Sequence, residues 1–279
     1  MIGRMGQGRM RQGDGYLLDN QQAEAGARLA ALAEVFDPAT FRHLDGLGIA
    51  PGWRCWEVGA GGPSVPWWLA TRVGPAGRVL ATDIDDSWLA GAGGPPVEVR
   101  RHEVGADAPP AGPFDLVHAR LVLVHVVNRD AALRSMVEVL RPGGWLLIED
   151  ADPALQPLAC PDEHGPEQRL ANRVRAAVRR LYAERGVDLG YGRTLPRRLR
   201  TAGLTAVRAE ASFPVATPAS AALEAATVSQ LRDRLLAAGG VTAAELDGYL
   251  AAIAAGRLDL TTAPMISAWG QRPGPAGPR

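Results

Sequence analysis

The sequence predicts an α/β protein whose mostly parallel sheet of seven strands is covered by helices on both faces. Between residues 53 and 150, short apolar runs alternate with helical segments, which is typical of parallel strands joined by crossover helices. Two later apolar runs supply the remaining strands. The predicted strands occupy residues 54–58, 78–82, 97–102, 114–118, 145–148, 207–215 and 264–269.

The helices are predicted from apolar residues that recur at helical spacing. Their ranges are 20–46, 66–73, 87–92, 131–140, 166–185 and 195–202, with two more inside 220–256 that are separated at Gly239–Gly240. In the helix at 166–185, Leu170, Val174 and Val178 share one face, and we expect the arginines at 169–180 and 193–200 to be mostly solvated.

The composition excludes several classes of protein. The 279 residues carry 30 basic and 30 acidic side chains, so no net charge attracts nucleic acid or an anionic membrane. Every basic residue is arginine, which excludes Schiff-base and P-loop lysine chemistry. Two cysteines cannot form a disulfide framework, and the sequence contains neither a secretory signal nor a long apolar span. We therefore expect a cytoplasmic protein.

A glycine-rich turn at 55–64, with the sequence CWEVGAGGPS, closes the first strand and opens a helix. Gly59 and Gly61 allow the backbone to turn sharply and to approach a ligand closely. Ser64 stands where a dinucleotide fingerprint needs its third glycine, which disfavours a nicotinamide-dependent oxidoreductase. Glu57, two residues before the first glycine, favours a cationic ligand over a pyrophosphate.

This E-x-G-x-G pattern resembles motif I of the class I S-adenosylmethionine (SAM)-dependent methyltransferases, although Pro63 replaces the usual third glycine. Four further segments match the family in order: an acid after the second strand, an acid after the third, F-D-x-V at 114–117 and L-R-P-G-G at 140–144. The resemblance covers residues 50–150. It implies a Rossmann-like class I methyltransferase fold, SAM as cofactor and S-adenosylhomocysteine (SAH) as product.

The resemblance also assigns expected cofactor contacts. Gly59, Ala60 and Gly61 would form the loop around the cofactor, and Glu57 would face its cationic groups. The other expected contacts are Asp83 with the ribose hydroxyls, Ile84 with adenine, Glu103 and Val104 with the adenine amino group, and Ala119 and Arg120 near the methyl group. Asp85 remains the alternative ribose ligand, and Glu103 is alternatively a solvated loop acid.

His125 is the candidate catalytic residue, because it follows the fourth strand where a general base would meet the acceptor. The alternative is a structural histidine, which is also the expected role of His118 within the strand. Base catalysis is not obligatory, since alignment of donor and acceptor lowers the barrier. Residues 119–121 lack the acid of a magnesium-dependent relative, so we expect no metal.

The segment at 16–46 resembles the helical lid of small-molecule methyltransferases. Tyr16 would contact the sulfonium and Arg28 the cofactor carboxylate, while a packed aromatic and a surface arginine are the alternatives. The predicted organisation is a disordered tail at 1–15, this lid, a SAM-binding domain at 47–272 with helical insertions near 160–186 and 217–258, and a disordered tail at 273–279.

The leading hypothesis is therefore a metal-independent methyltransferase of a small organic molecule, in the style of natural-product biosynthesis. The insertions would select the substrate, and a homodimer through the N-terminal or 220–256 helices is compatible with the sequence. One alternative keeps SAM but acts as a cyclase, hydroxylase or decarboxylase, because a fold does not fix a chemistry. Another is a non-enzymatic binding protein.

Overall fold

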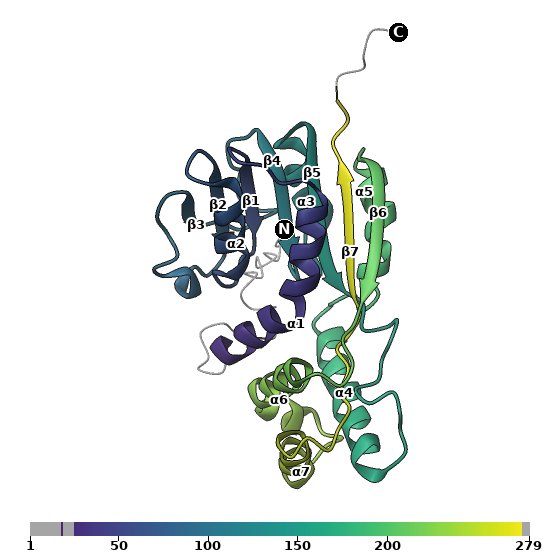
Figure 1. Ribbon diagram of the computed structural model, residues 1–279. Helices are drawn as coiled ribbons and strands as arrows, with labels where there is room; N and C mark the ends of the chain where they lie inside the picture. The colour runs from purple at the N-terminus through teal and green to yellow at the C-terminus, as the bar shows by residue number, and fades with distance from the viewer. Residues whose placement is uncertain (1–17, 19–24, 275–279) are drawn as a thin grey trace, which may run out of the picture.

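A computed structural model describes residue 18 and residues 25–274, and its centre is a seven-stranded sheet (Figure 1). The strand order is β3-β2-β1-β4-β5-β7-β6, and β7 runs antiparallel to both of its neighbours. The strands are β1 (Arg54–Val58), β2 (Arg78–Asp83), β3 (Val97–Arg101), β4 (Phe114–Arg120), β5 (Leu140–Ala151), β6 (Thr205–Ser212) and β7 (Met265–Gln271). This arrangement confirms the predicted α/β class.

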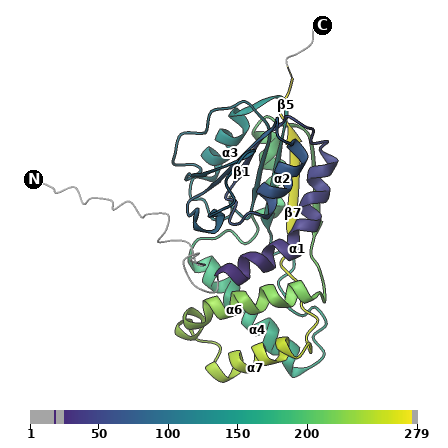
Figure 2. The ribbon, with the colours of Figure 1, turned by 60° about the vertical axis from the view of Figure 1, so that its left-hand side comes forward.

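Helices cover both faces of the sheet and also form a separate cap (Figure 2). One face packs against α3 (Arg129–Glu138) and α5 (Leu195–Thr201), and the other against α2 (Ser64–Val73) and the end of α1 (Ala25–Gly46). The cap, which we define as α4 (Pro166–Glu184), α6 (Pro218–Ala238) and α7 (Ala243–Ala254), has its own apolar core. Two short 3₁₀ turns complete the elements: η2 (Ser87–Leu89) and η3 (Gly192–Thr194).

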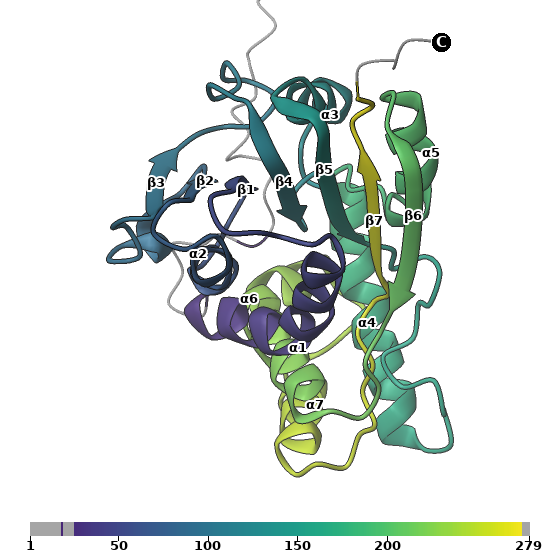
Figure 3. The same cartoon turned by 45° about the horizontal axis from the view of Figure 1, so that its top comes forward.

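The cap lies beyond the edge of the sheet where the parallel strands end (Figure 3). Ligands of open α/β sheets bind at this edge, because the loops that leave the strands gather there. The fold therefore encloses that edge between the sheet and an added helical layer. None of the described helices is both long enough and apolar enough to span a bilayer.

Helix α1 connects the two layers and contains Pro38, which removes one helical hydrogen bond. After Pro38, the side chains of Thr40 and His43 lie buried against the sheet, where both contact Glu149 of β5. Before Pro38, Arg28 donates a hydrogen bond to Gln230 of α6 over 3.0 Å. One end of the helix is thus fixed to the sheet and the other to the cap.

The elements differ from the predictions mainly at their ends. Residues 87–92 form only the turn η2, and α2 begins two residues before the predicted start. Strand β5 already begins at Leu140, because the Pro-Gly-Gly segment extends beside β4, where the register between the strands shifts. The predicted tail at 1–15 and residues 275–279 of the C-terminal tail lie outside the described residues.

Candidate functional site

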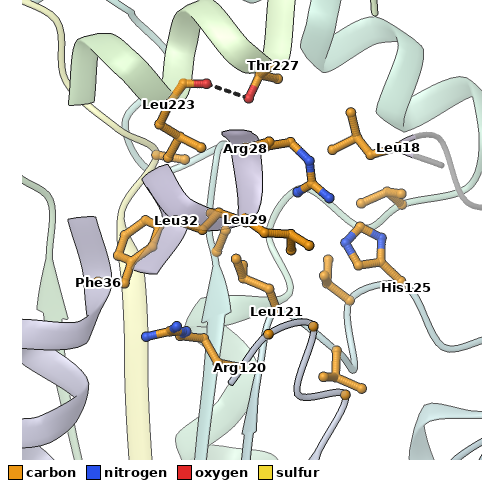
Figure 4. A pocket seen from close by; sticks show the side chains of 18 of the residues that line it. Leu18, Arg28, Leu29, Leu32, Phe36, Arg120, Leu121, His125, Leu223 and Thr227 are labelled. Carbon is orange, nitrogen blue, oxygen red and sulfur yellow. Dashed lines mark hydrogen bonds between the residues drawn. The ribbon is translucent and has the colours of Figure 1, made fainter. Parts of the chain in front are cut away.

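A cavity of about 940 Å³ lies between the sheet, α1 and the cap. Its sheet end is lined by the segments that follow β1, β2 and β3, and its cap end by side chains of α4 and α6. Apolar side chains of α1 separate the two ends, and Figure 4 shows Leu29, Leu32 and Phe36 along this wall. This volume falls within the usual range of small-molecule sites.

The glycine turn forms the floor of the sheet end. Gly59 has a φ of 62°, and a Cβ there would lie 2.4 Å from a methyl group of Val122, so only glycine fits. The N–H of Gly61 donates to the Asp83 carboxylate over 2.8 Å. Gly59, Ala60 and Gly61 all line the cavity, as the motif predicts.

Asp83 ends β2 and ties the glycine turn to the next loop. One carboxylate oxygen accepts the N–H of Gly61, and the other accepts the N–H of Asp85 over 3.0 Å. Burial raises the pKa of Asp83, while these backbone donors act in the opposite direction. A carboxylate has about four acceptor positions, so two remain for a ligand. Asp85 instead accepts the N–H of Ser87 and is not part of the cavity wall.

The far wall of the sheet end is apolar and partly exposed. Ile84 keeps 38% of its surface exposed, and Trp88 and Val104 lie on the same wall. Such a surface suits a flat aromatic ring. Glu103 does not reach this cavity and instead lines a small neighbouring pocket beside Ile84, because its backbone is held by Asp107.

His102 also lines the sheet end, although no sequence motif predicts a role for it. Its Nε2 donates to the carbonyl oxygen of Ala108 over 3.1 Å, so Nδ1 of the neutral ring is an acceptor. Among the described residues no group bonds to Nδ1. Its position in the sequence could have indicated this place in the wall, because it lies one residue after β3 and directly before the predicted adenine contacts.

Glu57 lies under the floor and not in the cavity, which corrects the expected contact with a cationic ligand. Its carboxylate is 2.6 Å from Nδ1 of His118, whose Nε2 is 3.3 Å from Glu149. Burial lowers the pKa of His118, but the two carboxylates outweigh it and raise that pKa to about 9. Glu57 of β1 lies in register with His118 of β4. Its carboxylate therefore pairs with the buried imidazolium of His118.

The expected position of Ala119 near the methyl group is also corrected. Its side chain belongs to the buried core on one face of β4 and is not exposed to the cavity. Arg120 does line the cavity, and it pairs with Asp37 and Thr40 of α1 at 2.9 Å each. The next residue, Leu121, has a φ of 57°, a strained conformation that concentrates at functional sites.

His125 and Arg28 lie on the same side of the cavity (Figure 4). Burial is the main cause that lowers the pKa of His125 to about 4, and the charges of Arg28 and Arg129 lower it further. The ring is therefore neutral near pH 7. Tyr16, the other predicted lid contact, lies outside the described residues.

The cap end consists of two helical stripes that face each other. The α4 stripe consists of Arg175, Val178, Arg179 and Tyr182, and the α6 stripe of Ser220, Leu223, Glu224 and Thr227; both follow the pattern i, i+3, i+4, i+7 of one helix face. Arg175 and Glu224 form a buried ion pair of 2.5 Å. The expectation that the α4 arginines are solvated is thus wrong for Arg175 and Arg179.

Residues 24–209 match the family described as "Methyltransferase domain". This match covers most of the chain, so the protein belongs to that family. Similar proteins include the methyltransferase str2 of Strobilurus tenacellus, 35% identical over 143 residues, which are 50% of this chain and 48% of that protein. The ubiquinone/menaquinone biosynthesis C-methyltransferase UbiE of Vibrio cholerae is 34% identical over 130 residues, 42% of this chain and 48% of its own. The matches therefore span about half the length of these relatives.

Solved structures share the fold. Phosphoethanolamine N-methyltransferase 2 of Haemonchus contortus, in complex with S-adenosyl-L-methionine, has a TM-score of 0.58 at 16% identity, with 96% of this chain and 61% of that chain covered. The YcgJ protein of Bacillus subtilis has a TM-score of 0.51 at 14% identity, with 83% and 99% covered. At such low identity these likenesses support the fold alone.

Proposed function

We propose that this protein is a SAM-dependent methyltransferase of a small organic molecule. The observation that carries the proposal is a single cavity that joins the glycine turn and Asp83 to the space under the cap. Membership of the methyltransferase-domain family supports it, as does the order of the sequence motifs. The proposal keeps three expectations from the sequence: the enzyme is cytoplasmic, it has no nucleic-acid partner, and it can form a homodimer.

The residues at the sheet end fit SAM. Asp83 has two acceptor positions left for the ribose hydroxyls, and Ile84 offers an exposed apolar surface for adenine. Arg28, on the α1 wall of the same cavity, is suited to the carboxylate of the methionine part. Val104 and His102 complete the wall around the adenine.

When bound, SAM supplies a methyl group on a sulfonium, which is a strong electrophile. The walls of the cavity hold the acceptor, exclude bulk water and align its lone pair with that methyl group. His125, whose ring is neutral near pH 7, would take up the proton that the methylated acceptor releases, unless that proton passes to solvent. Arg120 ends β4 and Leu121 follows it, where a metal-dependent relative would have a carboxylate, so the proposal includes no metal.

The test uses SAM with an isotopically labelled methyl group and a library of small organic acceptors. We expect SAH to form together with a labelled product, detected by mass spectrometry. The Asp83→Ala variant is the matched control and should form neither. Conversion of a library member without consumption of SAM would instead identify a cyclase, hydroxylase or decarboxylase. Binding of SAM without any conversion would favour a binding protein.

A further inference from the structure

We propose that the acceptor is a small organic anion with an apolar body, and that Arg179 binds its anionic group. This inference rests on the proposed function and adds the chemical class of the substrate. It follows from three features of the cap end: an arginine without a partner among the described residues, an excess of positive charge and apolar walls beside both.

Arg179 differs from the other arginines around the cavity. Arg175 is paired with Glu224, Arg120 with Asp37, and Arg129 lies 3.9 Å from Asp188. The Arg179 guanidinium makes no hydrogen bond or ion pair with any described residue, and its Nε is shielded from water. A shielded cationic donor without a partner costs free energy, and an anionic ligand removes that cost.

The balance of charge points to the same class of ligand. Of the described residues that line the cavity, Arg175, Arg179 and Arg185 belong to α4 or directly follow it, and the one acid of the α6 stripe is Glu224; Arg120 and Arg129 are balanced by Asp37 and Asp188 outside the wall. Asp83 belongs to the sheet end, and Glu224 already accepts from Arg175 and from the Tyr249 hydroxyl. The cap end therefore has a positive potential, which its low-dielectric walls strengthen.

The apolar walls of the cap end indicate the chemical character of the rest of the ligand. Val178 and Leu223 line the cap end, and Leu32 and Phe36 of α1 continue the apolar surface toward the sheet. A guanidinium binds a carboxylate through two parallel hydrogen bonds. A compact aromatic or aliphatic acid thus matches the site better than a neutral molecule or a polyanion.

The position of this anion site bears on His125. The segment after α4 approaches the loop of His125, since Gly186 accepts a hydrogen bond from Arg129 over 3.5 Å. A bound anion would offset the positive charges of Arg28 and Arg129, which lower the pKa of His125. The substrate itself would then make His125 a better proton acceptor.

The test measures binding to the SAH-loaded protein by calorimetry. The probes are matched pairs that differ only in charge: benzoate with benzamide, cinnamate with cinnamamide, and indole-3-acetate with its amide. We expect at least one acid to bind ten times more tightly than its amide. Arg179→Gln should abolish this preference and leave the affinity for SAH unchanged. Arg169→Gln, on the exposed face of the same helix, is the control and should behave as the wild type.

Arg179→Lys keeps the charge and should retain a weaker preference for the acids, which distinguishes lost recognition from lost folding. The inference is overturned if amides bind as well as acids, if no probe binds, or if Arg179→Gln keeps the preference. A loss of SAH affinity in Arg179→Gln would also overturn it, because Arg179 would then serve the cofactor carboxylate. A wild-type protein that binds neither SAM nor SAH would refute the proposed function instead.

Discussion

The two ends of the cavity are built in different ways. The sheet end consists of backbone turns that follow consecutive strands, and Asp83 fixes two of these turns through main-chain hydrogen bonds. The cap end consists of side chains on two helices, which meet through the Arg175–Glu224 pair. A site made of backbone turns suits a ligand that is common to many enzymes. A site made of helical side chains can change its ligand, because side chains can be exchanged without changing the backbone. The sheet end is thus suited to a constant cofactor and the cap end to a particular substrate.

Asp83→Ala should produce the largest change in ligand affinity, and this change should be confined to the sheet end. The change removes the acceptor of two backbone N–H groups and of the ribose hydroxyls. At 1–3 kcal/mol for each lost bond, we expect SAH affinity to fall about 1,000-fold. Calorimetry measures the affinity, with Asp85→Asn as the control that keeps wild-type binding. Equal losses in the two variants would show that the ribose does not depend on Asp83.

The buried imidazolium beneath the sheet end should make stability depend on pH. The pKa of His118 is raised to about 9 in the folded protein from 6.5 in the unfolded chain. Its contribution is therefore complete below pH 6.5 and is lost as the pH rises through 9. A shift of this size corresponds to about 3 kcal/mol in the free energy of unfolding.

Urea unfolding at pH 6.5 and pH 9.5 measures this difference. The His118→Asn variant should be less stable at pH 6.5 and should lose much less stability at the higher pH. His164→Gln is the control, because His164 is exposed on the surface. An identical pH dependence in wild type and His118→Asn would contradict a charged His118.

Leu223→Trp should affect the cap end alone. Leu223 lines the cavity beside Leu32 and Phe36 of α1, so the larger side chain fills part of the cap end, and we expect binding of the acid probes to weaken at least tenfold. SAH affinity should stay within about threefold of the wild type, since the sheet end is unchanged. Leu155→Trp, at an exposed position, controls for an added indole. A parallel loss of SAH affinity would mean that the two ends are not separate.

Gly26→Ala tests the α1 wall and should have the smallest effect. A Cβ at Gly26 would lie 2.6 Å from the Trp88 ring, so either this partly exposed ring or the start of α1 must shift at the sheet end. We expect SAH to bind about fivefold more weakly, although alanine favours the helix itself. Gly46→Ala, at the other end of α1 with no atom nearby, should leave binding unchanged.

The sheet end was largely predictable from the sequence, because its residues follow strands that can be located by their apolar runs. The motif identified Gly59, Gly61 and Asp83 correctly as neighbours of one cavity. It misplaced Glu57 and Ala119, because successive strand side chains point to opposite faces of the sheet and helices cover both faces, so both side chains are buried away from the cavity. His102 was missed because the motif comparison considered only the acid that follows it.

The cap end was not predictable in the same way. The arginines of α4 alternate between solvent and cavity: Arg173 is exposed, while Arg175 and Arg179 line the wall. Which face of α4 is covered depends on α6, which lies about 50 residues further along the chain. No local pattern contains that information, so the amphipathic pattern predicted that these arginines are mostly solvated.

The hydrogen bond between Arg28 and Gln230 joins residues that are 202 positions apart. On the ribosome, β1 to β6 and the glycine turn are made before α6, whereas β7 follows it, and segments near the N-terminus fold first. The first half of α1 must therefore wait for a partner that is made 202 residues later. The pocket can close only after α6 has been made, so a product truncated before α6 would present an open sheet end without its wall.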